Sequence, residues 1–212
     1  MSVQTGSKKA IRGPLAGVLA VLLTLGVMNG QWLAAQLYYR VSPPSASTSA
    51  DPALIATSLD PSAPTTVGIS RINVSAPIVF EPSLAERNIQ MALRRGVVHL
   101  GTTAEPGQPG NVALFGHSSG QPWAPGDYKF VFTLLDKLQT GDKIFVDHKG
   151  QRYIYKVTSS RTVMPEEVSV VYQGSGHQLT LITCTPVGTS EKRLVVSAEQ
   201  ISPKPAAATA SR

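Results

Sequence analysis

QLTLITC, residues 178–184, reads as a mostly apolar strand that ends at Cys184, and it decides the fold of this region. Residues 185–192 are rich in turn formers, and Arg193 then opens a second apolar run, LVVSA, at residues 194–198. Two such runs on either side of a turn predict an antiparallel hairpin. The hairpin would place Cys184 and Arg193 at one end of a sheet, where a cation favours the nucleophilic thiolate and stabilises a tetrahedral intermediate. The alternative is that Arg193 only solvates the rim of a loop.

Cys184 is the only cysteine of the chain, so no disulfide can form within it. A single thiol in an exported protein is a candidate reactive group. The alternative is a small buried hydrophobic residue, which free cysteine often is.

Cysteine acyl chemistry also needs a group that moves protons near neutral pH, and histidine is the usual choice. His117 follows the apolar run at residues 111–115, at a predicted junction between strand and loop, where a catalytic side chain is held firmly yet reaches a cleft. His177, in the loop before the thiol-bearing strand, is the second choice. We interpret His99, in an apolar run, as structural, and His148, next to a predicted turn, as exposed.

Short apolar or alternating runs, separated by Gly and Pro turns, occupy the middle of the chain and predict a mainly β domain, a barrel or a sandwich. The predicted strands are Val67–Ile72, Ala76–Phe80, Asn111–Phe115, Lys143–Asp147, Arg152–Val157, Gln178–Thr183 and Leu194–Ala198. Ser83 and Glu86 fit a capping box, which predicts a short helix from there to Gly96. Residues 130–138 predict a helical turn.

The N-terminal region has the pattern of a membrane anchor. Residues 14–39 are apolar enough and long enough for one transmembrane helix, with aromatic residues at the far end. Lys8, Lys9 and Arg12 precede it, so we expect a cytoplasmic N-terminus, residues 1–13, and an extracytoplasmic catalytic domain. The alternative is a cleaved signal peptide, with a weak cleavage pattern at residues 33–35.

The remaining boundaries follow from composition. Residues 40–65 are rich in Pro, Ser and Ala, which predicts an extended stalk. We expect residues 66–201 to form the domain and residues 202–212 to form a loose tail.

The formal net charge is +6, but residues 66–200 carry 13 basic and 11 acidic side chains, so the excess lies mostly at the ends of the chain. This distribution indicates membrane topology and argues against a nucleic-acid partner.

Three separated motifs resemble the sortase family. TLITC at residues 180–184 resembles the Thr-Leu-any-Thr-Cys signature, Arg193 falls where the family keeps an arginine, and NVALFGH at residues 111–117 resembles the histidine segment. Shorter matches occur at residues 72–79, 107–111, 141–142 and 163–165. The three motifs occur in the family's order, so the resemblance covers roughly residues 66–200.

The resemblance implies an eight-stranded β-barrel with short helices. It implies that Cys184 attacks the Thr–Gly bond of a sorting signal, often Leu-Pro-any-Thr-Gly, and forms a thioester that an amine of the cell wall or of a pilin resolves. His117 would be the acid and base, Arg193 would hold the substrate and the oxyanion, and Thr183 would contribute to the oxyanion site. The loop at residues 163–177 would line the signal groove.

Several alternatives stay open. Asp51-Pro52 is followed by Ala53, so the aromatic residue of a pilin-type lid is missing, and both the housekeeping and the pilin-polymerising subclass are possible. No calcium-ligand loop can be recognised, and no cofactor is expected. A cysteine hydrolase of wall peptides and a non-enzymatic, membrane-tethered β-domain are the rival functions.

Overall fold

The structure is a computed structural model, and it describes residues 16–24, 26, 30, 37, 59–121, 123–172 and 174–205. Residues 16–24 are helical, and the rest of the predicted membrane segment 14–39 lies mostly outside the described residues. Within the described part of the chain, no helix combines the length and the apolar character that crossing a membrane requires. Residues 1–13, most of the predicted stalk and the end of the predicted tail also lie outside the described residues.

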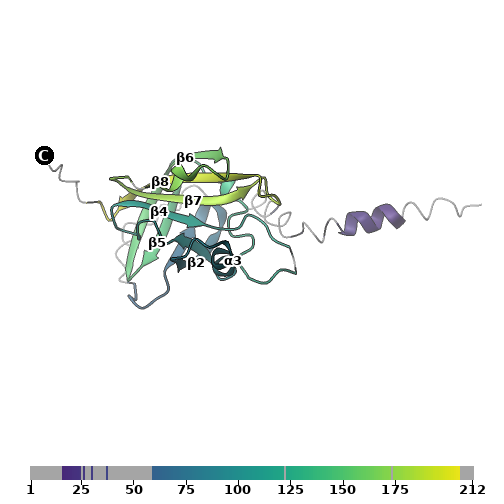
Figure 1. The fold of residues 1–212 in the computed structure, drawn as a ribbon, viewed down its shortest axis with the longest axis horizontal. Helices are drawn as coiled ribbons and strands as arrows, with labels where there is room; N and C mark the ends of the chain where they lie inside the picture. The colour runs from purple at the N-terminus through teal and green to yellow at the C-terminus, as the bar shows by residue number, and fades with distance from the viewer. Residues whose placement is uncertain are drawn as a thin grey trace, which may run out of the picture.

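Eight strands close into a β-barrel, as predicted, in the order β1-β2-β3-β4-β7-β8-β6-β5 (Figure 1). The strands are β1 (Thr66–Ile69), β2 (Val74–Glu81), β3 (Val97–Leu100), β4 (Gly110–Phe115), β5 (Lys143–His148), β6 (Gln151–Val163), β7 (His177–Thr185) and β8 (Lys192–Ser202). β2 and β3 pair in parallel, as do β4 and β7, and the other neighbours are antiparallel.

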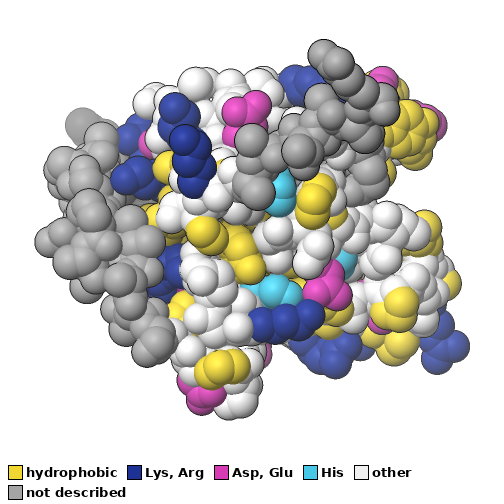
Figure 2. Space-filling view, turned by 90° about the vertical axis from the view of Figure 1, so that its left-hand side faces the viewer, with side chains coloured by type: hydrophobic (Ala, Val, Ile, Leu, Met, Phe, Trp, Pro, Cys, Tyr) yellow, Lys and Arg dark blue, Asp and Glu magenta, His cyan; other side chains and the backbone are white. Residues whose placement is uncertain are grey.

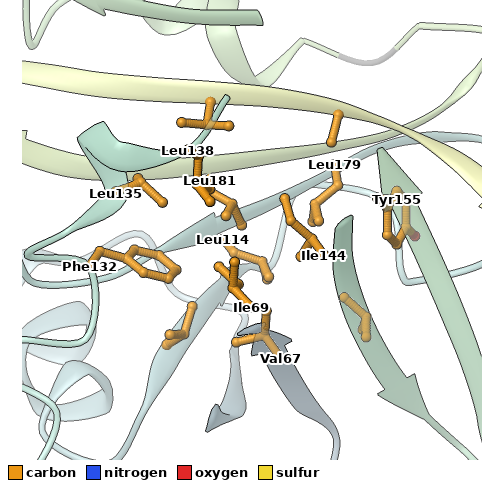
Figure 3. Packing of buried hydrophobic residues seen from close by; sticks show 14 of the residues in the cluster. Val67, Ile69, Leu114, Phe132, Leu135, Leu138, Ile144, Tyr155, Leu179 and Leu181 are labelled. Atoms are coloured by element: carbon orange, nitrogen blue, oxygen red, sulfur yellow. The ribbon is translucent and has the colours of Figure 1, made fainter. Parts of the chain in front are cut away.

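The interior of the barrel is filled by alternate residues of the strands (Figure 3). Val112 and Leu114 of β4 and Leu179 and Leu181 of β7 belong to this core. Because side chains alternate between the two faces of a strand, the residues between them face outward. The outward face of β4 and β7 therefore carries the chemistry described below.

The predicted helix is present but shorter, and the predicted capping box is wrong. Helix α3 (Glu86–Leu93) starts after Ala85, and no side chain caps it. The hydroxyl of Ser83 instead accepts a 3.2 Å hydrogen bond from the Ala85 N–H, because the chain makes a local turn there. The apolar face of α3 packs outside the barrel against Val98 of β3.

Other expected boundaries shift as well. The strand predicted to reach Ile72 ends at Ile69, and a 3₁₀ turn, η1 (Ser70–Ile72), follows. The helical turn expected at residues 130–138 is reduced to η2 (Leu135–Lys137). A third 3₁₀ turn, η3 (Val168–Val171), lies in the connection between β6 and β7. β6 and β8 extend well beyond the predicted ranges because they pair with each other along most of their length.

The strand directions define two ends of the barrel. β4 and β7 run in parallel towards one end, which we call the Cys184 end, and β8 begins there at Lys192. β1 begins and β8 finishes at the opposite end, which we call the His177 end.

Candidate active site

Cys184 and Arg193 are paired across neighbouring strands, which confirms the predicted hairpin. Their Cα atoms are register partners in the antiparallel pair of β7 and β8, and both residues are half-buried. Neighbouring strands lie about 5 Å apart, so thiol and guanidinium share one end of the barrel. In this structure the Arg193 Nη1 donates hydrogen bonds to the carbonyl oxygens of Ser190, at 2.9 Å, and Lys192, at 3.1 Å. The guanidinium is thus bound to its own turn.

His117 reaches the same place from a distant part of the sequence. β4 and β7 are parallel, with Phe115 opposite Ile182, and the Gly116 N–H continues the ladder with a 3.0 Å hydrogen bond to the Ile182 carbonyl. His117 and Cys184 each follow this pair by two residues, so the register places them at the same end of the barrel. The His117 carbonyl in turn accepts a 2.9 Å hydrogen bond from the Phe132 N–H, which fixes the backbone at the start of the loop.

Thr183 joins these two strand ends. Its side chain is 1% exposed, and its hydroxyl donates a 2.7 Å hydrogen bond to the carbonyl oxygen of Gly116. In this structure the hydroxyl therefore ties the residue before the thiol to the residue before the histidine. The expected contribution of Thr183 to an oxyanion site stays a prediction.

Burial sets the charge state of His117. Removal from water lowers the pKa of its imidazole below the ordinary value of 6.5, because the charged form is the more costly one to bury. His117 is therefore neutral at neutral pH and able to accept a proton, which suits a residue that takes a proton from a thiol.

The remaining histidines lie away from the thiol. His99 is 3% exposed and its Nε2 bonds the Ala104 carbonyl at 2.8 Å, which agrees with a structural role. His177 begins β7 and lies roughly 20 Å from Cys184 along that strand, too far to share a proton with it. Figure 2 looks onto the barrel end where β8 finishes and shows histidine side chains among Lys, Arg, Asp and Glu side chains.

The prediction that His148 is exposed is wrong. His148 ends β5 and is 5% exposed, because the segment before β1 covers it. Its Nδ1 lies 2.8 Å from the hydroxyl of Thr65, and its Nε2 lies 3.4 Å from a carboxylate oxygen of Glu105. The turn that follows is as tight as expected, since Lys149 and Gly150 both have positive φ.

Loops border the site. The Gly188 N–H, in the connection between β7 and β8, donates a 3.1 Å hydrogen bond to the hydroxyl of Ser119, two residues after His117. This bond docks the turn that holds Arg193 onto the loop that follows His117. The sequence analysis did not single out Ser119. The only feature of the sequence that could have pointed to Ser119 is its position in a Ser- and Gly-rich loop just after the candidate histidine.

The barrel, its strand order and the placement of His117, Cys184 and Arg193 agree with the family that the motifs suggested. The sequence pattern of that family, described as the Sortase domain, matches residues 67–201. The chain belongs to the sortase family. The match includes all eight strands except the first residue of β1 and the last of β8, and the family is one of cysteine transpeptidases.

This chain is identical to several curated sortases at about one third of the aligned positions. The chain is 32% identical to Sortase SrtE1 of Streptomyces coelicolor over 155 residues, which cover 65% of this chain and 42% of that protein. It is 33% identical to Sortase A of Bacillus anthracis over 95 residues, which cover 45% of this chain and 42% of that protein. The chain thus spans less than half the length of these two relatives.

Solved sortase structures share the fold. A sortase C1 from Streptococcus agalactiae, in complex with MTSET, has a TM-score of 0.54 and 31% identity, covering 65% of this chain and 66% of that chain. A sortase E mutant from Streptomyces avermitilis has a TM-score of 0.54 and 25% identity, covering 68% of this chain and 90% of that chain.

Proposed function

We propose that this sortase is a transpeptidase that cleaves a sorting signal of the Leu-Pro-any-Thr-Gly type between Thr and Gly and joins the new carboxyl group to an amine. The observation that carries the proposal is the strand register that gathers His117, Cys184 and Arg193 at one end of the barrel. A thiol, an imidazole and a guanidinium supply a nucleophile, a proton carrier and a donor for a developing oxyanion.

The first half-reaction breaks the peptide bond. Cys184 Sγ attacks the threonine carbonyl carbon while neutral His117 takes the thiol proton. His117 then gives this proton to the glycine nitrogen as the C–N bond breaks, so that a thioester and a free amine result. The lowered pKa of His117 supports this role, because the imidazole returns readily to its neutral form.

The second half-reaction reverses the roles. The acceptor amine attacks the thioester carbon, His117 takes its proton, and the proton returns to the sulfur as the C–S bond breaks. An amine that is bound in place has an advantage over water through proximity and orientation. The acceptor is a cell-wall precursor or a lysine of a pilin.

In this proposal Arg193 binds the substrate and stabilises the oxyanion. Its guanidinium donates to the carbonyl oxygen on which negative charge develops. Thr183 contributes to the same oxyanion site through its place beside the nucleophile, since its hydroxyl proton is donated to the Gly116 carbonyl. Two carbonyl oxygens, of Ser190 and Lys192, hold the guanidinium in this structure. We expect the bound sorting signal to exchange these neutral contacts for contacts to its own carbonyl groups.

We expect the sorting signal to approach along the outward face of β4 and β7. Ala113 and Ile182 lie on this face, in the same alternation as Cys184, and they are 0% and 6% exposed, so other parts of the chain cover them in this structure. The 3₁₀ turn η3, in the connection between β6 and β7, lies against β4. An extended peptide that lies on this face would reach Cys184 at its end. The solved structures include "Group B Streptococcus Pilus Island 1 Sortase C2", which keeps a pilin acceptor among the alternatives.

The test is mass spectrometry of the purified full-length chain with a Leu-Pro-any-Thr-Gly peptide, with and without excess triglycine. We expect an amide product that requires Cys184. If only the hydrolysed acid forms, across several peptides and amines including a lysine-bearing pilin segment, the chain is a cysteine hydrolase. If a labelled iodoacetamide reacts with Cys184 only after denaturation, the non-enzymatic alternative is favoured.

A further inference from the structure

Two buried polar side chains lie on the outward face of β4 and β7, at the far end of the strip that leads to Cys184. Asn111 is 2% exposed and Thr180 is 4% exposed. The Thr180 hydroxyl donates a 2.8 Å hydrogen bond to Asn111 Oδ1, and Asn111 Nδ2 donates a 3.1 Å hydrogen bond to the carbonyl oxygen of Val170. Because the hydroxyl proton is directed at Oδ1, the amide nitrogen faces Val170, so Thr180 sets the orientation of the Asn111 amide.

Val170 belongs to η3, which has little packing of its own. None of the four η3 residues is buried, and Val168 and the following Tyr172 are 58% and 65% exposed. A turn without a buried side chain depends on backbone contacts for its position. The bond from Asn111 supplies such a contact from a buried side chain on a rigid strand.

The segment that contains η3 connects the two ends of the barrel. It begins after Val163, which is the register partner of Arg193 at the Cys184 end. It finishes at His177, which pairs with Gly110 at the opposite end. η3 lies between these two ends, and its contact with Asn111 places it against the outward face of β4.

We propose that Asn111 is a positioning residue, oriented by Thr180, that holds residues 164–176 against β4 as the wall of the cleft leading to Cys184. The inference rests on the proposed function, since the cleft is the place of the sorting signal. Asn111 touches none of the reacting atoms, because it lies roughly 20 Å from the Cys184 end of the strip. Loss of the contact should therefore weaken peptide binding and leave the thiol chemistry intact.

The experiment compares four variants of the full-length chain with the unaltered protein. Asn111→Ala and Thr180→Val each break the network, whereas Thr180→Ser keeps the hydroxyl. Thr158→Val is the control, because it removes an exposed threonine hydroxyl of β6 that bonds the Ser197 carbonyl of β8 at 3.1 Å and takes no part in the bonds of Asn111. The readouts are amide hydrogen exchange within residues 164–176, KM and kcat for the sorting peptide, and the rate of Cys184 alkylation by iodoacetamide.

For Asn111→Ala and Thr180→Val we expect amide exchange within residues 164–176 to rise about tenfold and KM to rise by a similar factor, the size expected for one lost hydrogen bond. We expect kcat and the alkylation rate to stay within about twofold, since no reacting group has moved. Thr180→Ser should match the unaltered protein, and Thr158→Val should leave residues 164–176 unchanged.

Hydrogen exchange needs no substrate, so it separates this proposal from the proposed function. Unchanged exchange in residues 164–176 of Thr180→Val would overturn the positioning role, even if Asn111→Ala fails to fold. If amide exchange in residues 164–176 rises but the protein processes no sorting peptide, the anchoring of this segment by Asn111 stands. The claim that the segment forms the wall of a substrate cleft would then be wrong. A fall in kcat or in the alkylation rate equal to the rise in KM would also overturn the proposal.

Discussion

The Thr183 hydroxyl donates a 2.7 Å hydrogen bond to the Gly116 carbonyl oxygen, and this bond links the residue before the thiol to the residue before the histidine. The two residues are 67 positions apart in the sequence. The bond is buried, so its loss leaves a carbonyl oxygen with a lone pair that water cannot easily reach. A side chain beside the thiol thus reinforces the alignment that the backbone bond from Gly116 to Ile182 begins.

Thr183→Val should destabilise the protein and slow catalysis. The change keeps the shape but removes the hydroxyl, and an unsatisfied buried polar group costs about 1–3 kcal/mol of the free energy of unfolding. Thr183→Ser, which keeps the donor, should lose less. Urea unfolding and kcat/KM measured together test this. Equal stability of the Val and Ser variants would show that the hydrogen bond contributes nothing.

Cys184→Ala should abolish turnover and leave the barrel intact, because the thiol is the proposed nucleophile and the side chain is only half-buried. Cys184→Ser should be nearly inactive too, since an alcohol is a weak nucleophile without further activation. Circular dichroism checks the fold, and mass spectrometry of the peptide checks turnover. Activity above a few per cent of the unaltered enzyme in either variant would contradict the assignment.

Arg193→Lys should be far more damaging than the retained charge suggests. A planar guanidinium bonds two acceptors at once, as it does with Ser190 and Lys192 here, whereas an ammonium is a point charge on a flexible stem. Loss of one oxyanion donor lowers kcat by about 100- to 1000-fold in other enzymes. Lys192→Ala, an exposed neighbour, is the control. A Lys variant at position 193 within threefold of the unaltered rate, about the scatter of such assays, would reject the substrate-clamp role.

Stability should fall as the pH decreases from about 6.5, because burial lowers the pKa of His99, His117 and His148 in the folded chain. The unfolded chain, whose histidines keep ordinary pKa values near 6.5, takes up protons at a higher pH than the folded chain does. Protons therefore favour unfolding between pH 6.5 and the lower folded-state pKa values. Urea unfolding at pH 7.5, 6.5 and 5.5 measures this dependence, because these pH values lie at, and about one unit on either side of, the ordinary histidine pKa.

His99→Gln tests whether the buried histidines cause this loss of stability at lower pH. Glutamine can keep a donor near the Ala104 carbonyl but cannot titrate, so the loss of stability with falling pH should become smaller. His99 Nδ1 has no hydrogen-bond partner among the described residues, which explains why a second proton there is costly. Stability that is constant or rises on acidification would contradict the burial argument.

Protease added to intact protoplasts should remove the barrel domain while residues 1–13 stay protected. The reason is the placement of Lys8, Lys9 and Arg12 before the apolar segment, which favours a cytoplasmic N-terminus. Epitope tags at the two ends, followed by immunoblotting, give the readout, and lysed protoplasts are the control. Full protection of the C-terminal tag would overturn the proposed topology.

The hairpin that carries Cys184 and Arg193 was predictable from the sequence, because its two apolar runs are neighbours in the chain and a turn between them leaves one simple pairing. Most strands and the mainly β class follow from local alternation and from turn residues in the same way, whereas the choice of a barrel over a sandwich came from the family resemblance, and β3 was not predicted. The wrong predictions concern burial, helix capping and several element boundaries. His148 looks exposed beside its turn, but Thr65 and Glu105, from other parts of the chain, lie against its two ring nitrogens.

The sequence favoured His117 over His177, and the tertiary structure supplies the physical reason. His177 is nearer to Cys184 in sequence, yet it lies at the other end of the same extended strand, because each strand residue adds about 3.3 Å. His117 is distant in sequence, and the parallel pairing of β4 with β7 brings it beside the thiol. Parallel pairing joins segments through a long crossover, so its register is set by packing of the whole barrel and not by any local pattern. The contact from Asn111 to Val170 depends on that same packing, because the residues that form it meet only once the barrel has closed.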